Sequence, residues 1–171
     1  MAGKSSYAKA SEQRLEYLAN AADVYLQSQL AAALAADQRA LVFAGFMATA
    51  VIALGSGAAV VLTGSTVKHC IGWLAIWEAC GLLVAMLLAI WSARPTRWYF
   101  PGSHPQSWKS DFEQMKSEKD QMAELLADYD VRIAQNHLTM ADNGRLLWNA
   151  QCTALGFLIL GAAALALIVT K

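Results

Sequence analysis

Glu78 is the one charged side chain in the apolar segment 71–92 of this 171-residue sequence, and it is the first candidate for a functional residue. A carboxylate within a membrane helix is costly, and by default it marks a functional site. The small residues Gly81, Ala85 and Ala89 share a helix face with Glu78, and such a face favours close contact between helices. Two roles remain open for Glu78: a ring of carboxylates at the outer mouth of a pore, or a hydrogen-bonding residue in helix packing.

A second feature is a set of three hydroxyl side chains, Thr49, Ser56 and Thr63, spaced seven residues apart in another apolar segment. In a helix this spacing keeps them on one face, with a drift of about 20° per seven residues. Small, uncharged hydrogen-bonding groups suit the axis of a water-filled pore. The alternative is that each hydroxyl bonds the carbonyl four residues earlier or a neighbouring helix. We interpret these residues, with Glu78, as candidates for lining a pore.

Aromatic and arginine side chains outside the apolar segments are candidates for binding a ligand. They are Tyr7, Arg14 and Tyr25, near one face of an N-terminal helix, with Arg97 and Trp98 after the second apolar segment. Arginine and aromatic rings together can neutralise phosphates and stack nucleobases. The same residues also suit a solvated helix face and an interfacial aromatic belt. The formal net charge of zero argues against a general nucleic-acid binder, so any nucleotide would be recognised locally.

Catalytic and metal-binding patterns are not supported by the sequence. The tripeptide Gly55-Ser56-Gly57 is similar to the serine motif of rhomboid-type intramembrane proteases, but Leu54 stands where that motif requires glycine. None of the three histidines lies within an apolar segment to act as a base there. The three cysteines form no CxxC pair, which implies neither a disulfide framework nor a metal site. We therefore expect no enzyme activity, no metal and no cofactor.

Three long apolar segments determine the predicted fold class. The chain is 57% hydrophobic and only 15% charged, whereas a soluble domain has about 25% charged residues. A helix needs roughly 20 apolar residues to cross a bilayer. The sequence predicts an all-α integral membrane protein, homo-oligomeric, with long cytoplasmic helices in a bundle. The expected divisions are a cytoplasmic helix at 1–40, transmembrane helices at 41–62, 71–92 and 148–171, an external loop at 63–70, an interfacial break at 93–109 and a cytoplasmic heptad helix at 110–147.

Lysine and arginine are distributed unevenly about these segments, and their distribution predicts the orientation. Residues 1–40 carry four of them and residues 93–145 carry seven, whereas the opposite side has only Lys68 and Lys171. The N-terminus and the segment 93–145 are therefore expected in the cytoplasm, with the C-terminus outside. No proline occurs between Ser11 and Leu62, so one helix is expected to continue from the cytoplasm into the membrane.

The second cytoplasmic segment has an apolar heptad repeat over five heptads, which is typical of coiled-coil or bundle packing. Ser110 and Glu113 have the spacing of a capping box at its start. Asn143-Gly144 is expected to kink the chain before the third transmembrane helix. The seam residues that could hold subunits together are Leu126, Ile133, Asn136, Met140 and Asn143. Packing of the same seam inside one subunit remains equally open, and buried asparagine would fix the register in either case.

The order of these elements resembles the small membrane effectors of bacterial anti-phage defence, the SLATT group, and most closely the channel effectors of the Hailong system. The likeness covers Ser11–Leu62, a second helix with Trp73, Trp77 and Glu78, the break Arg97–Gly102 and the helix 110–147, whereas the segment 152–170 departs from a two-helix effector. The resemblance implies a homotetrameric channel of the bacterial inner membrane. It also implies a cytoplasmic cone that binds an oligodeoxyadenylate made by a partner nucleotidyltransferase. Loss of this ligand would open the channel and depolarise the cell.

Functions of three classes therefore remain open. The first is a ligand-gated homo-oligomeric channel that acts as a defence effector, with membrane lipid, further copies of the chain, permeating ions and a nucleotide signal as its partners. The second is a non-conducting membrane scaffold that recruits a partner through its coiled coil. The third is a holin-like pore former, which the extensive cytoplasmic helices disfavour. Conductance in liposomes separates the scaffold from the other two.

Overall fold

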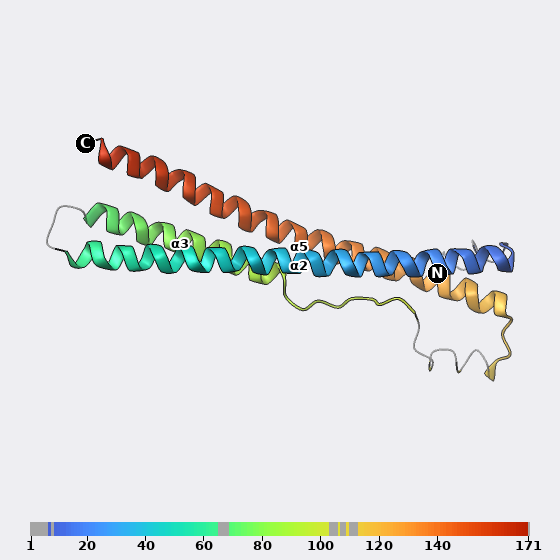
Figure 1. The fold of residues 1–171 in the computed structure, drawn as a ribbon. Helices are drawn as coiled ribbons and strands as arrows, with labels where there is room; N and C mark the ends of the chain where they lie inside the picture. Colours follow the sequence, from blue (N-terminus) through green and yellow to red (C-terminus); the bar gives the residue numbers. More distant parts are fainter. Residues whose placement is uncertain are drawn as a thin grey trace. The chain divides into compact units, whose positions relative to one another are not determined.

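Long helices make up most of the protein. The computed structural model describes residues 7, 9–64, 69–102, 106, 109 and 113–170. Over this part of the chain α2 spans Glu12–Thr63, α3 spans His69–Ser92 and α5 spans Glu118–Val169, and no strand is present (Figure 1). The all-α prediction is confirmed, and so is the uninterrupted helix expected over Ser11–Leu62.

Each of the three helices contains a stretch that is long and apolar enough to cross a membrane. Only 6% of the most apolar 18-residue window of α2 is buried, against 28% in α3 and 11% in α5. A water-soluble protein would bury such side chains, because their exposure to water costs about 25 cal/mol per Å². The apolar side chains that stand outward here therefore suit lipid, and the protein is a membrane protein with three candidate spans.

The contacts within the chain divide it into two units. We call residues 1–34 and 96–140 the polar unit, and residues 35–95 and 141–171 the apolar unit. The polar unit holds 18 of the 26 Asp, Glu, Lys and Arg residues of the sequence. Stretches of α2 and α5 belong to both units, whereas α3 lies in the apolar unit alone.

In the apolar unit, small residues form the contacts between helices. One buried cluster joins Ala44 of α2, Ala89 of α3 and Ala150 of α5. A second cluster contains Leu82, Ala85 and Ala154. Residue numbers rise along α3 as they fall along α5, so these two helices run antiparallel. Alanine at the contacts permits close approach of the helix backbones, which is how helices associate in lipid without a hydrophobic driving force.

In the polar unit, stretches of α2 and α5 run in parallel around a small core. Leu15 and Leu26 of α2 and Leu126 and Tyr129 of α5 are buried. α5 begins with a side-chain cap, because the Ser117 hydroxyl oxygen accepts a hydrogen bond of 3.2 Å from the Asp120 backbone N–H. Such a cap satisfies one of the amide groups that the first turn of a helix leaves unpaired.

Two boundaries expected for α5 are wrong. The helix begins at Glu118 rather than at residue 110, because Met115 adopts a positive φ of 50° in a turn and Ser117 provides the cap. The expected capping residue Ser110 lies outside the described residues. The helix also continues through Asn143-Gly144 without a break, so 110–147 and 148–171 are not separate helices. One glycine costs a helix only about 1 kcal/mol, which the flanking turns offset.

Candidate functional site

The three hydroxyl side chains of α2 lie on a face that the chain itself leaves uncovered. Thr49, Ser56 and Thr63 are all exposed. At about 100° per residue they lie on the far side of α2 from the buried residues Ala44 and Ala58. The prediction that they share one face is therefore consistent with the helix geometry, and no described part of the chain packs over them.

Each of these hydroxyl groups donates a hydrogen bond to the carbonyl four residues earlier. The distances are 3.1 Å from Thr49 to Gly45, 2.7 Å from Ser56 to Ile52 and 2.8 Å from Thr63 to Ala59. This is the bonding that the alternative interpretation expected. A hydroxyl oxygen that donates its proton still has two lone pairs to accept from water or to contact a cation. The face can therefore still accept hydrogen bonds in an otherwise apolar span.

Glu78 does not lie with the hydroxyl groups. It belongs to α3, is only 8% exposed, and faces α5. Its carboxylate lies against Gly161, where a Cβ would overlap it. The preceding residue of α3, Trp77, also contacts α5, because its ring centroid lies 4.6 Å from that of Phe157. The residue is therefore packed between helices of its own chain, and its place at the outer mouth of a pore stays a prediction.

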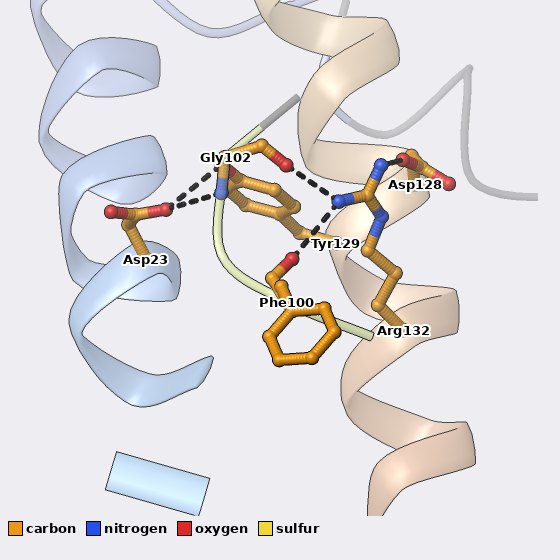
Figure 2. Close-up of polar contacts among 6 residues, drawn as sticks. All are labelled: Asp23, Phe100, Gly102, Asp128, Tyr129 and Arg132. Atoms are coloured by element: carbon orange, nitrogen blue, oxygen red, sulfur yellow. Dashed lines mark hydrogen bonds and ion pairs between the residues drawn. The ribbon is translucent and has the colours of Figure 1, made fainter. Parts of the chain in front are cut away.

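The polar unit contains a segment that the sequence did not predict to be ordered, residues 96–102, which we call the strap. Figure 2 shows it passing between Asp23 of α2 and the α5 residues Tyr129 and Arg132. Asp23 Oδ1 accepts hydrogen bonds of 3.0 Å from the Gly102 N–H and 3.0 Å from the Tyr129 hydroxyl. Gly102 has a φ of +78°, which side chains with a Cβ rarely adopt. Glycine at this position therefore allows the strap to turn toward both helices.

Arg132 holds the other side of the same turn. Its Nη1 donates to the carbonyl oxygens of Phe100 at 3.1 Å and Gly102 at 2.7 Å. Its Nη2 forms an ion pair with Asp128 at 2.6 Å, and its guanidinium lies 5.6 Å from the centroid of the Tyr129 ring. The guanidinium is thus fixed by a carboxylate and a ring face while it binds the strap backbone, a geometry that lysine cannot reproduce.

Asn136 binds the strap through both ends of its amide. Its Oδ1 accepts from the Tyr99 N–H and its Nδ2 donates to the Tyr99 carbonyl, each at 3.0 Å. The side chain is 1% exposed. Among the other predicted seam residues Leu126 is buried, and Ile133, Met140 and Asn143 are half-buried. The seam is therefore used within the chain at Leu126 and Asn136, and its role between subunits stays a prediction.

The strap is not predicted by the sequence, because the heptad pattern predicts that the seam of α5 packs against another helix and not against an extended segment. The signal that could have found it is the polar set Tyr129, Arg132 and Asn136, which recurs at intervals of three and four on one face of α5. Side chains that combine donors and acceptors at such spacing can bind an extended backbone. The Pro-Gly turn at 101–102 supplies such a backbone, with its N–H and carbonyl groups unpaired by helix.

Of the residues predicted to bind a ligand, Tyr7 has a partner within the chain. Its hydroxyl donates to Asp130 at 2.8 Å, and this bond raises the pKa of the Tyr7 phenol. Arg14 and Arg97 are exposed, Tyr25 is 49% exposed and Trp98 is half-buried. Arg14 and Tyr25 lie three turns apart on one face of α2. Among the described residues, no hydrogen bond, ion pair or ring contact joins any two of these five, and their role in binding a ligand stays a prediction.

Comparisons with models of known protein families, with curated proteins and with solved structures give no match to this chain.

Proposed function

We propose that the protein is a homo-oligomeric ion channel of the bacterial inner membrane whose conducting path is lined by Thr49, Ser56 and Thr63. The observation that carries this proposal is the exposed hydroxyl face of α2, in a span where only 6% of the most apolar window is buried. Each hydroxyl proton is bonded to a carbonyl of its own helix, but the oxygen lone pairs find no donor in lipid and find one in water. A face with three outward oxygens along four turns is therefore better suited to a wet path than to acyl chains.

One copy of α2 cannot enclose water, so the path requires several copies around an axis. The hydroxyl face also carries small residues, Gly45 one turn before Thr49 and Ala59 one turn before Thr63. A Cβ built at Gly45 would meet no atom within 4 Å, so no other part of the described chain covers this position. Small residues on an exposed membrane face permit close approach of a second helix. Four copies, the number that the resemblance to defence effectors implies, would place one hydroxyl stripe from each subunit around the axis.

In this proposal the polar unit is cytoplasmic and the C-terminus is periplasmic. The support is the excess of Lys and Arg in residues 1–40 and 93–145. Trp91 and Arg94 at the end of α3 also fit a headgroup zone, because the guanidinium carbon of Arg94 lies 5.2 Å from the Trp91 ring centroid. The polar unit is then the part that an intracellular signal reaches.

We further propose that a nucleotide signal, such as an oligodeoxyadenylate made by a partner nucleotidyltransferase, binds the polar unit and keeps the channel shut. Its loss during phage infection would open the channel and depolarise the cell. The exposed Arg14, Tyr25 and Arg97 support this proposal, since they remain free to neutralise phosphates and stack bases. The choice of oligodeoxyadenylate comes from the resemblance alone.

A non-conducting scaffold is the second candidate, and one observation favours it. Val131 and Leu138, seven residues apart on α5, are 53% and 65% exposed in the polar unit. Exposed apolar residues at heptad spacing can dock a partner helix. Such a scaffold would need neither the hydroxyl face nor conduction.

Ion flux from liposomes tests the proposal. The purified full-length chain is reconstituted into vesicles loaded with KCl, and efflux is followed with and without oligodeoxyadenylate or oligodeoxycytidylate of equal length. The channel proposal expects efflux above that of empty vesicles, and suppression by oligodeoxyadenylate only. No efflux under any condition would favour the scaffold. Efflux that neither oligonucleotide changes would keep the channel and refute this gating ligand.

A further inference from the structure

The apolar unit has a pocket between its three helices. Its volume is ≈ 330 Å³, and its walls are apolar side chains such as Leu54 of α2, Leu74 of α3 and Leu158 and Leu165 of α5. This volume is at the small end of the range of about 300–1,000 Å³ that small-molecule sites occupy. The hydroxyl face of α2 contributes none of its three residues to the lining.

Glu78 is the one acidic residue in the wall of this pocket. Its Oε1 is buried and has no hydrogen-bond partner among the residues that the structure describes. An unpaired carboxyl oxygen in an apolar environment is unfavourable, because it loses the hydrogen bonds that water would give it. Gly161 leaves room for the carboxylate at the pocket wall, because any Cβ there would overlap it. The chain thus keeps an acid at a place where the described residues provide no partner for its Oε1.

We propose that this pocket binds a small lipophilic ammonium ion, with the Glu78 carboxylate as its counter-charge and the leucine walls around its hydrocarbon part. The ammonium group supplies the positive charge and hydrogen-bond donor that the Glu78 carboxylate lacks, and the hydrocarbon part replaces lipid against the walls. The site is independent of the hydroxyl face and of any conduction through it.

An organic cation fits the pocket better than a metal ion does. No group of three or more His, Cys, Asp or Glu side chains is arranged to hold a metal in the described part of the chain. Mg²⁺ and Ca²⁺ take six or more oxygen ligands, and the described lining offers the oxygens of one carboxylate only. An ammonium with a hydrocarbon body needs one anionic contact and otherwise apolar surface, which is what the lining provides.

Equilibrium dialysis of the detergent-solubilised full-length chain tests the proposal, with 1-adamantylammonium as the probe and protein-free micelles as the blank. Neutral 1-adamantanol, which has the same cage without the charge, is the matched ligand control. The parent should bind the ammonium saturably, at about one per chain, and should bind the alcohol roughly 10- to 100-fold more weakly, as expected for loss of a charge-assisted hydrogen bond. Equal binding of both probes would refute the role of the carboxylate.

Three variants complete the test. Glu78→Gln keeps the size of the side chain and should weaken ammonium binding by roughly 10- to 100-fold. Ala162→Leu fills the pocket, keeps Glu78 and should also abolish binding. Asp37→Asn removes a carboxylate outside the pocket and should bind as the parent does. Parental affinity in either Glu78→Gln or Ala162→Leu would overturn the assignment, and so would absence of saturable binding to the parent. Because binding is measured without conductance, failure here is distinct from failure of the channel proposal.

Discussion

Replacement of Asn136 with alanine should release the strap. The substitution removes two hydrogen bonds of 3.0 Å and leaves the N–H and carbonyl of Tyr99 without the amide that joins them to α5. At about 0.5–1.5 kcal/mol per bond, the loss amounts to about 1–3 kcal/mol of local stability. Since about 1.4 kcal/mol is a factor of ten, amide exchange in the strap should accelerate by roughly 5- to 150-fold.

Hydrogen-exchange mass spectrometry of the full-length protein in detergent measures this change on peptides that cover residues 96–102. Asn143→Ala is the matched control, because Asn143 occupies the same heptad position one repeat later and has no hydrogen bond to the described strap. Exchange in the strap should stay at the parental rate in this control. Parental exchange in Asn136→Ala would refute the conclusion that the Asn136 amide holds the strap.

Three further predictions concern pH, packing and topology. Burial, and a hydrogen bond donated to the Asp23 carboxylate, raise the pKa of Tyr129 above its ordinary value of 10.0. The stability that the neutral phenol provides is therefore complete below about pH 10 and is lost as pH rises through the raised pKa. Denaturant titrations at a series of pH values from about 9 to 11 should record a fall in the free energy of unfolding. Gly81→Ala should lower stability by about 1–3 kcal/mol in thermal melts, because its Cβ would overlap the Phe157 ring. Exposed Cys70 should react with an impermeant maleimide in intact cells, whereas Gln114→Cys in a Cys70→Ser background should react only after permeabilisation.

Each of these predictions has a control. Tyr129→Phe should remove most of the alkaline loss, and an unchanged alkaline transition in that variant would exclude Tyr129 as its source. Gly55→Ala should leave the melting temperature unchanged, since a Cβ there meets no atom within 4 Å; an equal loss in both glycine variants would contradict the packing argument. Labelling of Gln114→Cys from outside in the Cys70→Ser background would contradict the proposed orientation.

The sequence predicts those features of the fold that depend on local pattern. The α2 helix could be predicted because no proline interrupts it, and the three apolar stretches because their length alone is diagnostic. The start of α5 could not, since Ser110 with Glu113 and Ser117 with Asp120 present the same capping spacing. Only the turn at Met115, where φ is positive, excludes the earlier start. Local pattern cannot rank two equivalent caps.

The contacts of the candidate site could not be predicted from the sequence, because they join residues that are far apart along the chain. Tyr99 and Asn136 are separated by 37 residues, and Glu78 lies still further from Gly161 along the chain. Periodicity assigns each residue to a helix face, but it does not say which partner covers that face. The heptad predicts Asn136 as a buried polar residue of the seam, but it does not predict that the partner of its amide is the backbone of Tyr99.

The central claim is that the hydroxyl face of α2 lines a conducting path, and one pair of variants tests it directly. Ser56→Leu places an apolar side chain on the face, where hydrophobic constrictions block ions by dewetting. Gly57→Leu places the same side chain at the same depth, about 100° around the helix, where a Cβ meets no atom within 4 Å. Single-channel recording in planar bilayers, at matched oligomeric state, should show conductance lost in Ser56→Leu and retained in Gly57→Leu. Parental conductance in Ser56→Leu would contradict the account.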